Sequence, residues 1–125
     1  MLLVDDMRLE GEESVSEYKV KGDEFFLDGH FPGKPIVPGV ILCEIMGQGA
    51  SILMQSRLDG TVIPVFVGMD KVRFKRMALP GDTIETRGKV VDVKGNIIFI
   101  ETVARIEGDL CCSAKLTVAL VKKED

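Results

Sequence analysis

The sequence contains little of what several classes of protein depend on. It has only three cysteines (Cys43, Cys111 and Cys112), and their spacing matches no zinc site, so we expect reduced packing residues in a cytoplasmic protein. Acidic residues outnumber basic ones, and the net charge of −4 argues against a general nucleic-acid binder. The N-terminus has no basic region followed by an apolar core, so no signal peptide is expected. The longest apolar stretch, residues 40–54, is too short to span a bilayer.

Histidine is also scarce, since His30 is the only one in the chain. It is therefore the only side chain whose unperturbed pKa lies near neutral pH. It stands in a segment rich in proline and glycine, residues 29–39, which we expect to follow a fixed, non-helical path until a helix begins at Pro38-Gly39. Fourteen residues after His30, Glu44 is the only charged residue between Pro35 and Arg57.

The length of 125 residues favours one domain, residues 1–125, with no internal repeat. Between residues 40 and about 57 the chain lacks proline and is mostly apolar, which predicts one long helix. Alternating and β-branched segments predict a series of strands. These are expected at residues 14–21, 62–74, 83–93, 97–106 and 110–121. Links of hairpin size predict antiparallel pairing, and hence an α+β fold in which a meander curls around a buried helix.

The predicted helix carries its polar side chains on one narrow stripe. Glu44, Gln48, Ser51 and Gln55 are spaced by four, three and four residues, and the rest of the surface is apolar. Such a helix is usually buried, and the glycines within it would let a sheet approach closely. We therefore expect Glu44 to be a buried acid whose protonated form is favoured, which suits proton donation.

His30, Glu44 and the helix N-terminus together could catalyse proton transfer. A neutral imidazole is a good general base at neutral pH, and the N–H groups of Gly39 and Val40 could bind a carbonyl oxygen that gains negative charge. These groups suit the dehydration of a β-hydroxyacyl compound or the reverse hydration. The residues alone leave alternatives open. His30 could be a surface residue, Glu44 an ordinary solvent-facing position, and the proline-rich segment a structural turn.

Several motifs run through nearly the whole chain in a characteristic order. They are GHFPGKP (29–35), PGV (38–40), EIMGQ (44–48), FVGMDKVRFKR (66–76) and PGD (80–82). In these motifs the sequence resembles the FabZ-type (3R)-hydroxyacyl-acyl-carrier-protein dehydratases. The resemblance implies a hotdog fold, in which a curved antiparallel sheet wraps a central helix, and it implies no cofactor and no metal.

The resemblance also implies residue roles. His30 would be the base and Glu44 the acid, while the N–H of Gly39 or Val40 would hold the thioester oxygen. The substrate site would further include Phe31 and Gln48, with Gln48 fixing the geometry of the acid. In this family the histidine and the acid of one site come from different subunits, so a homodimer is expected, commonly assembled into a trimer of dimers.

A basic group follows the acidic residue Asp70. It comprises Lys71, Arg73, Lys75 and Arg76. As a bare charge run it is most often a solvated strand face, and strand alternation would place Lys71, Arg73 and Lys75 on one side of the sheet. Because acyl carrier protein is strongly acidic, a basic rim on a net-acidic enzyme would steer it toward the tunnel mouth. Arg73 and Lys75 are the expected principal contacts.

Other functions of the same fold remain open from the sequence. An acyl-thioester hydrolase would use the acid to activate water, and a non-catalytic acyl-CoA-sensing module would lose the acid–base pair. Dehydratase-isomerases of the FabA type carry an aspartate where this chain has Glu44, which favours the plain dehydratase, although an isomerase of the FabN type stays possible. Gly47, Gly49 and Cys43 depart from the usual family pattern and leave the acyl chain-length preference open.

Overall fold

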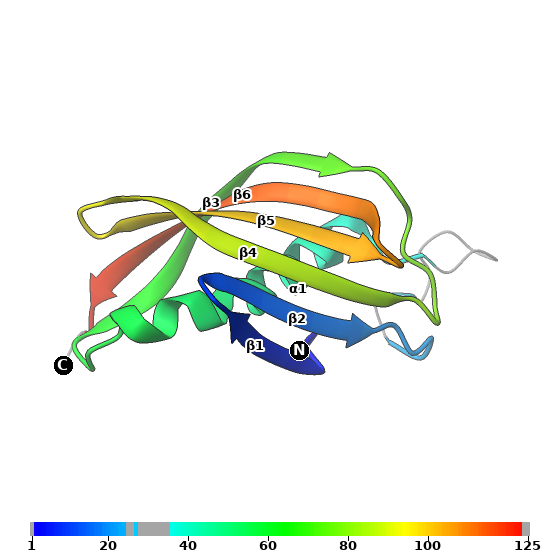
Figure 1. Cartoon of the computed structure of the whole chain (residues 1–125), viewed down its shortest axis with the longest axis horizontal. Helices are drawn as coiled ribbons and strands as arrows, with labels where there is room; N and C mark the ends of the chain where they lie inside the picture. Colours follow the sequence, from blue (N-terminus) through cyan, green and yellow to red (C-terminus); the bar gives the residue numbers. More distant parts are fainter. Residues whose placement is uncertain (1, 25–26, 28–35, 124–125) are drawn as a thin grey trace.

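A computed structural model describes residues 2–24, 27 and 36–123. Figure 1 shows a curved sheet with a helix lying against it. The elements, in chain order, are β1 (Asp6–Glu10), β2 (Glu13–Lys19), α1 (Gly39–Ala50), the 3₁₀ helix η2 (Ser51–Arg57), β3 (Val62–Phe74), β4 (Thr83–Lys94), β5 (Ile97–Ile106) and β6 (Asp109–Lys122). The expected α+β class is confirmed.

The sheet has the strand order β1-β2-β4-β5-β6-β3, and every neighbouring pair is antiparallel. β4, β5 and β6 form the expected meander, because the turns at Gly95-Asn96 and Glu107-Gly108 reverse the chain tightly. β3 does not join this meander at β4. It pairs with β6 instead and so forms one edge of the sheet, while β1 forms the other edge.

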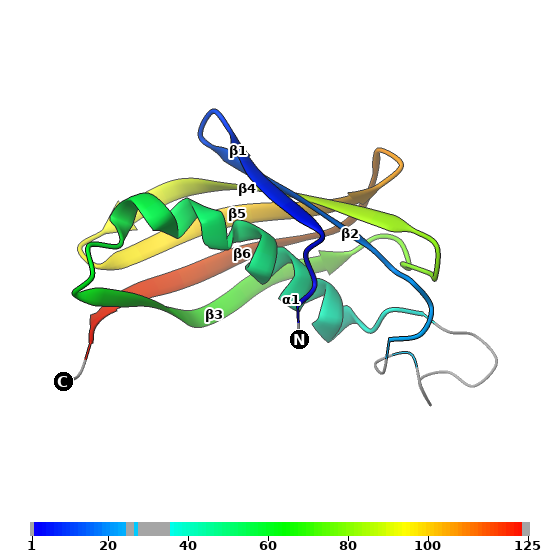
Figure 2. The same cartoon turned by 90° about the horizontal axis from the view of Figure 1, so that it is seen from below.

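α1 lies against one face of the sheet, mainly over β2, β4 and β5 (Figure 2). Leu42, Ile45 and Met46 face the sheet and are buried in its core. A side chain at Gly49 would collide with the hydroxyl groups of Ser16 and Thr86, so glycine allows the helix backbone to approach the strands. The expected close approach of helix and sheet is confirmed.

The predicted helix differs from the structure in its length and in its burial. The α-helix ends at Ala50, and residues 51–57 continue as a 3₁₀ helix. At this junction the Ser51 hydroxyl donates to the Gln48 carbonyl at 2.7 Å, and such local bonds compete with regular helix geometry. Val40 and Glu44 are exposed, because the sheet covers only the opposite side of α1. Within the described ranges, no helix has the length and apolarity needed to cross a membrane.

The three cysteines are free thiols. Cys111 and Cys112 are neighbours, and regular alternation predicts that they face opposite sides of a strand. Both are buried in the same core cluster, because the pairing of β5 with β6 shifts register between Ala104 and Arg105. Burial raises the pKa of the Cys112 thiol to about 12, with a further contribution from the other two cysteines, so this thiol stays protonated.

Candidate active site

The side of α1 that the sheet leaves open faces the edge strand β3 across a groove of about 300 Å³. The helix contributes Glu44 and Gly47 to this groove, and β3 contributes the ring of Phe66, which lies over Gly47. The remaining lining residues are mostly apolar, namely Val40, Cys43, Val67, Gly68, Met69 and Leu116. An apolar groove with one carboxylate fits an acyl chain that reacts at one polar position.

The Glu44 carboxylate lies in this groove and is exposed, so the expectation of a buried acid is wrong for the single chain. Its side chain is held by Gln48, one helical turn later, whose Nε2 donates to Glu44 Oε1 at 3.1 Å. Gln48 Oε1 in turn accepts the backbone N–H of Leu3 at 2.7 Å. Glu44 therefore has a defined hydrogen-bond partner, but its carboxylate would be buried only if the groove were covered.

The N-terminus of α1 opens near the same groove. Pro38 precedes the helix with extended backbone geometry, and its carbonyl accepts the N–H groups of Ile41 and Leu42 at 3.0 and 3.1 Å. The N–H groups of Gly39 and Val40 have no hydrogen-bond partner among the described residues. Among the described residues they are thus available as donors at the positive end of the helix dipole.

Gly39 is also required for packing. A Cβ at this position would lie 2.8 Å from the ring of Phe74, at the end of β3. Because the ring packs directly on the backbone, β3 and the helix N-terminus are held together at this end of the groove.

His30 and Phe31 lie outside the described residues. The described chain on either side of residues 28–35 is attached to one segment, residues 78–82. On the entry side the Val20 N–H donates to the Asp82 carbonyl and the Gly81 N–H to the Val20 carbonyl. On the exit side the Val37 N–H donates to the Ala78 carbonyl at 2.9 Å. Residues 78–82, which include the PGD motif, therefore bind both flanks of the histidine segment.

A carboxylate that the sequence reasoning missed stabilises the entry flank. Glu24 accepts hydrogen bonds from the Tyr18 hydroxyl at 2.5 Å and from the backbone N–H groups of Lys21 and Gly22 at 2.9 and 2.8 Å. Burial acts to raise the pKa of Glu24, but these hydrogen bonds outweigh it and lower the pKa to about 2. Burial and the bond to Glu24 together raise the pKa of Tyr18. The sequence signal at this turn is Gly22, because its φ of 109° is a backbone conformation that favours glycine.

The basic group follows the expected alternation only in part. The pairing of β3 with β6 shifts register between Asp70 and Arg73, with Lys71 at a positive φ of 52°, and β3 ends at Phe74. Lys71 and Arg73 nevertheless line one shallow groove together with Glu101 and Lys115. Lys75 is exposed beyond the strand end. Arg76 is engaged within the chain, since its Nη1 donates to the Ile106 carbonyl and to Asp109, each at 3.2 Å.

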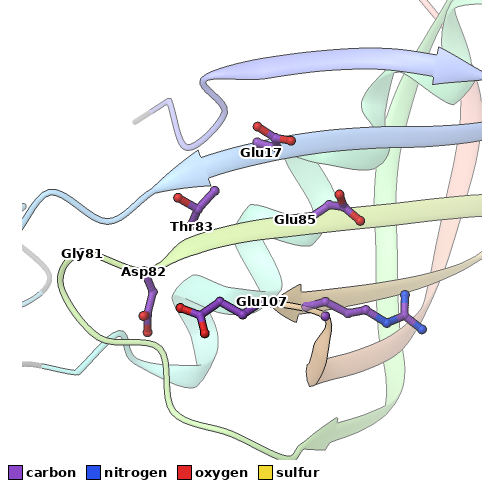
Figure 3. A pocket seen from close by; sticks show the side chains of 8 residues that line it. Glu17, Gly81, Asp82, Thr83, Glu85 and Glu107 are labelled. Atoms are coloured by element: carbon purple, nitrogen blue, oxygen red, sulfur yellow. The ribbon is translucent and has the colours of Figure 1, made fainter.

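A second pocket, of about 410 Å³, is acidic and lies beside β2 and β4 (Figure 3). Four carboxylates line it together with one basic side chain, namely Glu17, Asp82, Glu85, Glu107 and Arg105. No group of three or more His, Cys, Asp or Glu side chains placed to hold a metal ion occurs in the part of the chain that the structure describes. The pocket has neither the apolar lining nor the helix N-terminus of the Glu44 groove, so the Glu44 groove is the candidate active site.

Comparison with known proteins shows similarity over most of the chain. Residues 6–115 match the family model described as ApeI-like, ApeI dehydratase. The 3-hydroxyacyl-[acyl-carrier-protein] dehydratase FabZ of Petrotoga mobilis is 38% identical over 122 residues, covering 97% of this chain and 88% of that protein.

Two solved structures share the fold at low sequence identity. A thioesterase-superfamily member from Thermus thermophilus superposes with a TM-score of 0.79 at 20% identity, covering 92% of this chain and 85% of that chain. The dehydratase heterocomplex ApeI:P of Xenorhabdus doucetiae superposes with a TM-score of 0.76 at 15% identity, covering 98% of this chain and 84% of that chain. At these identities the two structures establish the hotdog-type fold only.

Proposed function

The chain belongs to the family of FabZ-type 3-hydroxyacyl-acyl-carrier-protein dehydratases, and we propose that His30 and Glu44 are the base and acid of its reaction. The enzyme is a hydro-lyase that removes water from a (3R)-3-hydroxyacyl thioester to give the trans-2-enoyl thioester. The observation that carries the assignment of Glu44 is its position in an apolar groove that also includes Val40 at the helix N-terminus. We take residues 1–125 as one dehydratase domain, and its cytoplasmic location stays a prediction.

Each group has one step in the proposed mechanism. The His30 imidazole takes the proton from the carbon next to the thioester carbonyl. The N–H of Gly39 or Val40 donates to the carbonyl oxygen as negative charge develops there. Glu44 gives its proton to the hydroxyl as the bond between carbon 3 and oxygen breaks, and water leaves. The next turnover requires His30 to lose a proton and Glu44 to regain one, which exchange with solvent accomplishes.

We propose that Gln48 is a positioning residue for the acid. Its amide donates to Glu44 Oε1, so the carboxyl group keeps one orientation in the groove. A fixed carboxyl loses less entropy on reaching the transition state than a freely rotating one.

We further propose that the working unit is a homodimer, assembled into a trimer of dimers. Among the described strands β3 pairs with β6 only, so its other side is an edge of the sheet. Large apolar side chains along this strand are exposed, namely Ile63, Val65, Phe66 and Val67. A second copy that covers this edge would bury the groove and bring its own His30 to Glu44, which would supply the burial that the single chain lacks.

The partner that delivers the substrate is acyl carrier protein, and we propose that basic residues at the end of β3 bind it. Lys71 and Arg73 share a shallow groove with Lys115, and Lys75 is exposed nearby. Arg76 contributes less, because it already binds Asp109 and the Ile106 carbonyl. These contacts would mainly raise the association rate and would weaken with added salt.

The decisive assay is product analysis with a 3-hydroxyacyl-acyl-carrier-protein substrate across acyl lengths. The expected product is the conjugated enoyl thioester, without release of free thiol. Thiol release with no enoyl product would instead identify a thioesterase. His30→Ala and Glu44→Gln are each expected to abolish turnover and to keep the far-UV circular dichroism spectrum of the wild type. Full activity in either variant would contradict the assigned role.

A further inference from the structure

The N-terminal segment, residues 2–5, is attached to two elements of the fold. The Asp5 N–H donates to the Glu17 carbonyl of β2 at 2.7 Å, and the Leu3 N–H donates to Gln48 Oε1 of α1 at 2.7 Å. The Leu3 side chain is buried in the core beside residues of β2 and α1. Figure 2 shows the N-terminus beside α1. The Leu3 N–H is thus held in place both by its own side chain and by the strand pairing that follows it.

This contact favours one orientation of the Gln48 amide. A backbone N–H only donates, so the Gln48 atom that faces Leu3 must be the oxygen. The Nε2 group must then lie on the other side, where Glu44 Oε1 accepts its hydrogen bond at 3.1 Å. Loss of the Leu3 N–H removes this constraint, and an amide oxygen turned toward Glu44 would accept the carboxyl proton that the reaction needs.

We infer that the backbone N–H of Leu3 is a positioning group for the dehydration reaction, acting on Glu44 through Gln48. The inference rests on the proposed role of Glu44 as the acid. It extends the active site to a residue 45 positions away from Gln48 in the sequence. It also assigns the two carboxyl oxygens, because Oε1 accepts from Gln48 and the transferred proton is therefore carried by Oε2.

Three single variants separate the N–H from the side chain. Leu3→Pro removes the N–H, Leu3→Ala keeps the N–H and removes most of the side chain, and Leu2→Pro places the same ring one residue earlier at an exposed position. We expect Leu3→Pro to lower kcat about tenfold or more with KM nearly unchanged, since a small misplacement of a catalytic group is costly. Leu3→Ala should lower the stability but keep kcat within about threefold, and Leu2→Pro should match the wild type.

A double-mutant cycle tests whether the effect passes through Gln48. In a Gln48→Leu background, Leu3→Pro should lower kcat no further than Gln48→Leu alone, to within about twofold. A merely structural role of Leu3 would make the two losses multiply, and that result would overturn the inference.

Amide hydrogen exchange gives an independent test that needs no proline variant. Gln48→Leu should accelerate exchange at the Leu3 N–H and leave the Asp5 N–H, which is bonded to Glu17, unchanged. Unchanged exchange at Leu3 would overturn the inference even if Leu3→Pro fails to fold. If Glu44→Gln keeps full activity, the proposed function itself fails. If Glu44→Gln is inactive while Leu3→Pro is as active as Leu3→Ala, only the Leu3 inference fails.

Discussion

The two edges of the sheet are built in opposite ways. β1 has only 5 residues, and Arg8 at its centre forms ion pairs with Asp6 and Glu10 at 3.0 and 2.9 Å. β3 has 13 residues, and its exposed side chains are largely apolar. The two strands lie at opposite edges of the sheet (Figure 1). Short, charged edge strands resist pairing with another chain, whereas long apolar edges favour it.

The difference indicates which edge the proposed dimer would use. The groove that holds Glu44 opens beside β3, at the apolar edge, and not beside the charged edge. A second chain that pairs along β3 would therefore cover the apolar strand and the acid together. The β1 side, in contrast, is stabilised by contacts within the chain, including those of Arg8, Arg87 and Glu24.

The largest expected effect comes from mixing two inactive proteins. His30→Ala and Glu44→Gln dimers, after proven subunit exchange, should recover about a quarter of the wild-type activity, because half of randomly assorted dimers are mixed and each has one intact site. The measurement is enoyl-thioester formation before and after exchange. No recovery would mean that the site is not shared across the β3 edge.

A matched pair of charge substitutions tests the edges directly. Val65 on β3 is 41% exposed and Leu9 on β1 is 50% exposed, so both residues are apolar and accessible in the single chain. Val65→Lys should dissociate the dimer and lower activity about 100-fold, because a charge would be buried at the interface. Leu9→Lys should leave the dimer and the activity unchanged. Sedimentation velocity and kcat/KM check the two outcomes, and equal effects of the two variants would remove the distinction between the edges.

Glu24 tests the claim that the β1 side is stabilised within the chain. Glu24→Gln replaces a carboxylate that accepts three donors and should lower the free energy of unfolding by about 2 kcal/mol. It should leave the dimer dissociation constant unchanged. Asp59→Asn is the matched control for removing a carboxylate charge from a turn. Asp59 also accepts hydrogen bonds there, from the N–H and the hydroxyl of Thr61.

The same substitution has a defined pH dependence. The pKa of Glu24 is lowered to about 2 in the folded chain, so its stabilisation is complete above the pKa of the unfolded state. It is lost as the pH falls through that value toward about 2. Urea unfolding at several pH values should therefore show the difference between wild type and Glu24→Gln shrinking on acidification. A constant difference would contradict the role of the carboxylate charge.

The smallest effect is expected at the charged edge itself. Arg8→Ala removes exposed ion pairs, and such pairs contribute little to stability in water. The thermal midpoint should shift by no more than about 2 °C, and the oligomeric state should not change. Formation of larger assemblies by this variant would show that Arg8 protects the β1 edge against pairing.

The boundaries of five strands could be read from the sequence with good accuracy, whereas β1 was not predicted. The segments predicted at residues 62–74 and 97–106 coincide with β3 and β5, because β-branched residues and tight turns act locally. The end of α1 was misplaced, since the hydroxyl of Ser51 binds the Gln48 carbonyl and the helix tightens there. The irregular pairing at Lys71 has no signal in the charge pattern either, although Lys71 and Arg73 still line one shallow groove.

The sequence by itself determined the class of fold, the family and the chemistry that His30 and Glu44 are proposed to perform. These follow from residue types and spacings, which act over one turn of helix or one strand pair. Only the tertiary structure decided that β3 pairs with β6 and not with β4. It also decided that Glu44 is exposed to solvent and that the Leu3 N–H donates to Gln48. Contacts of this kind join residues distant in sequence, and they depend on how the whole sheet curves around α1, which no local pattern encodes.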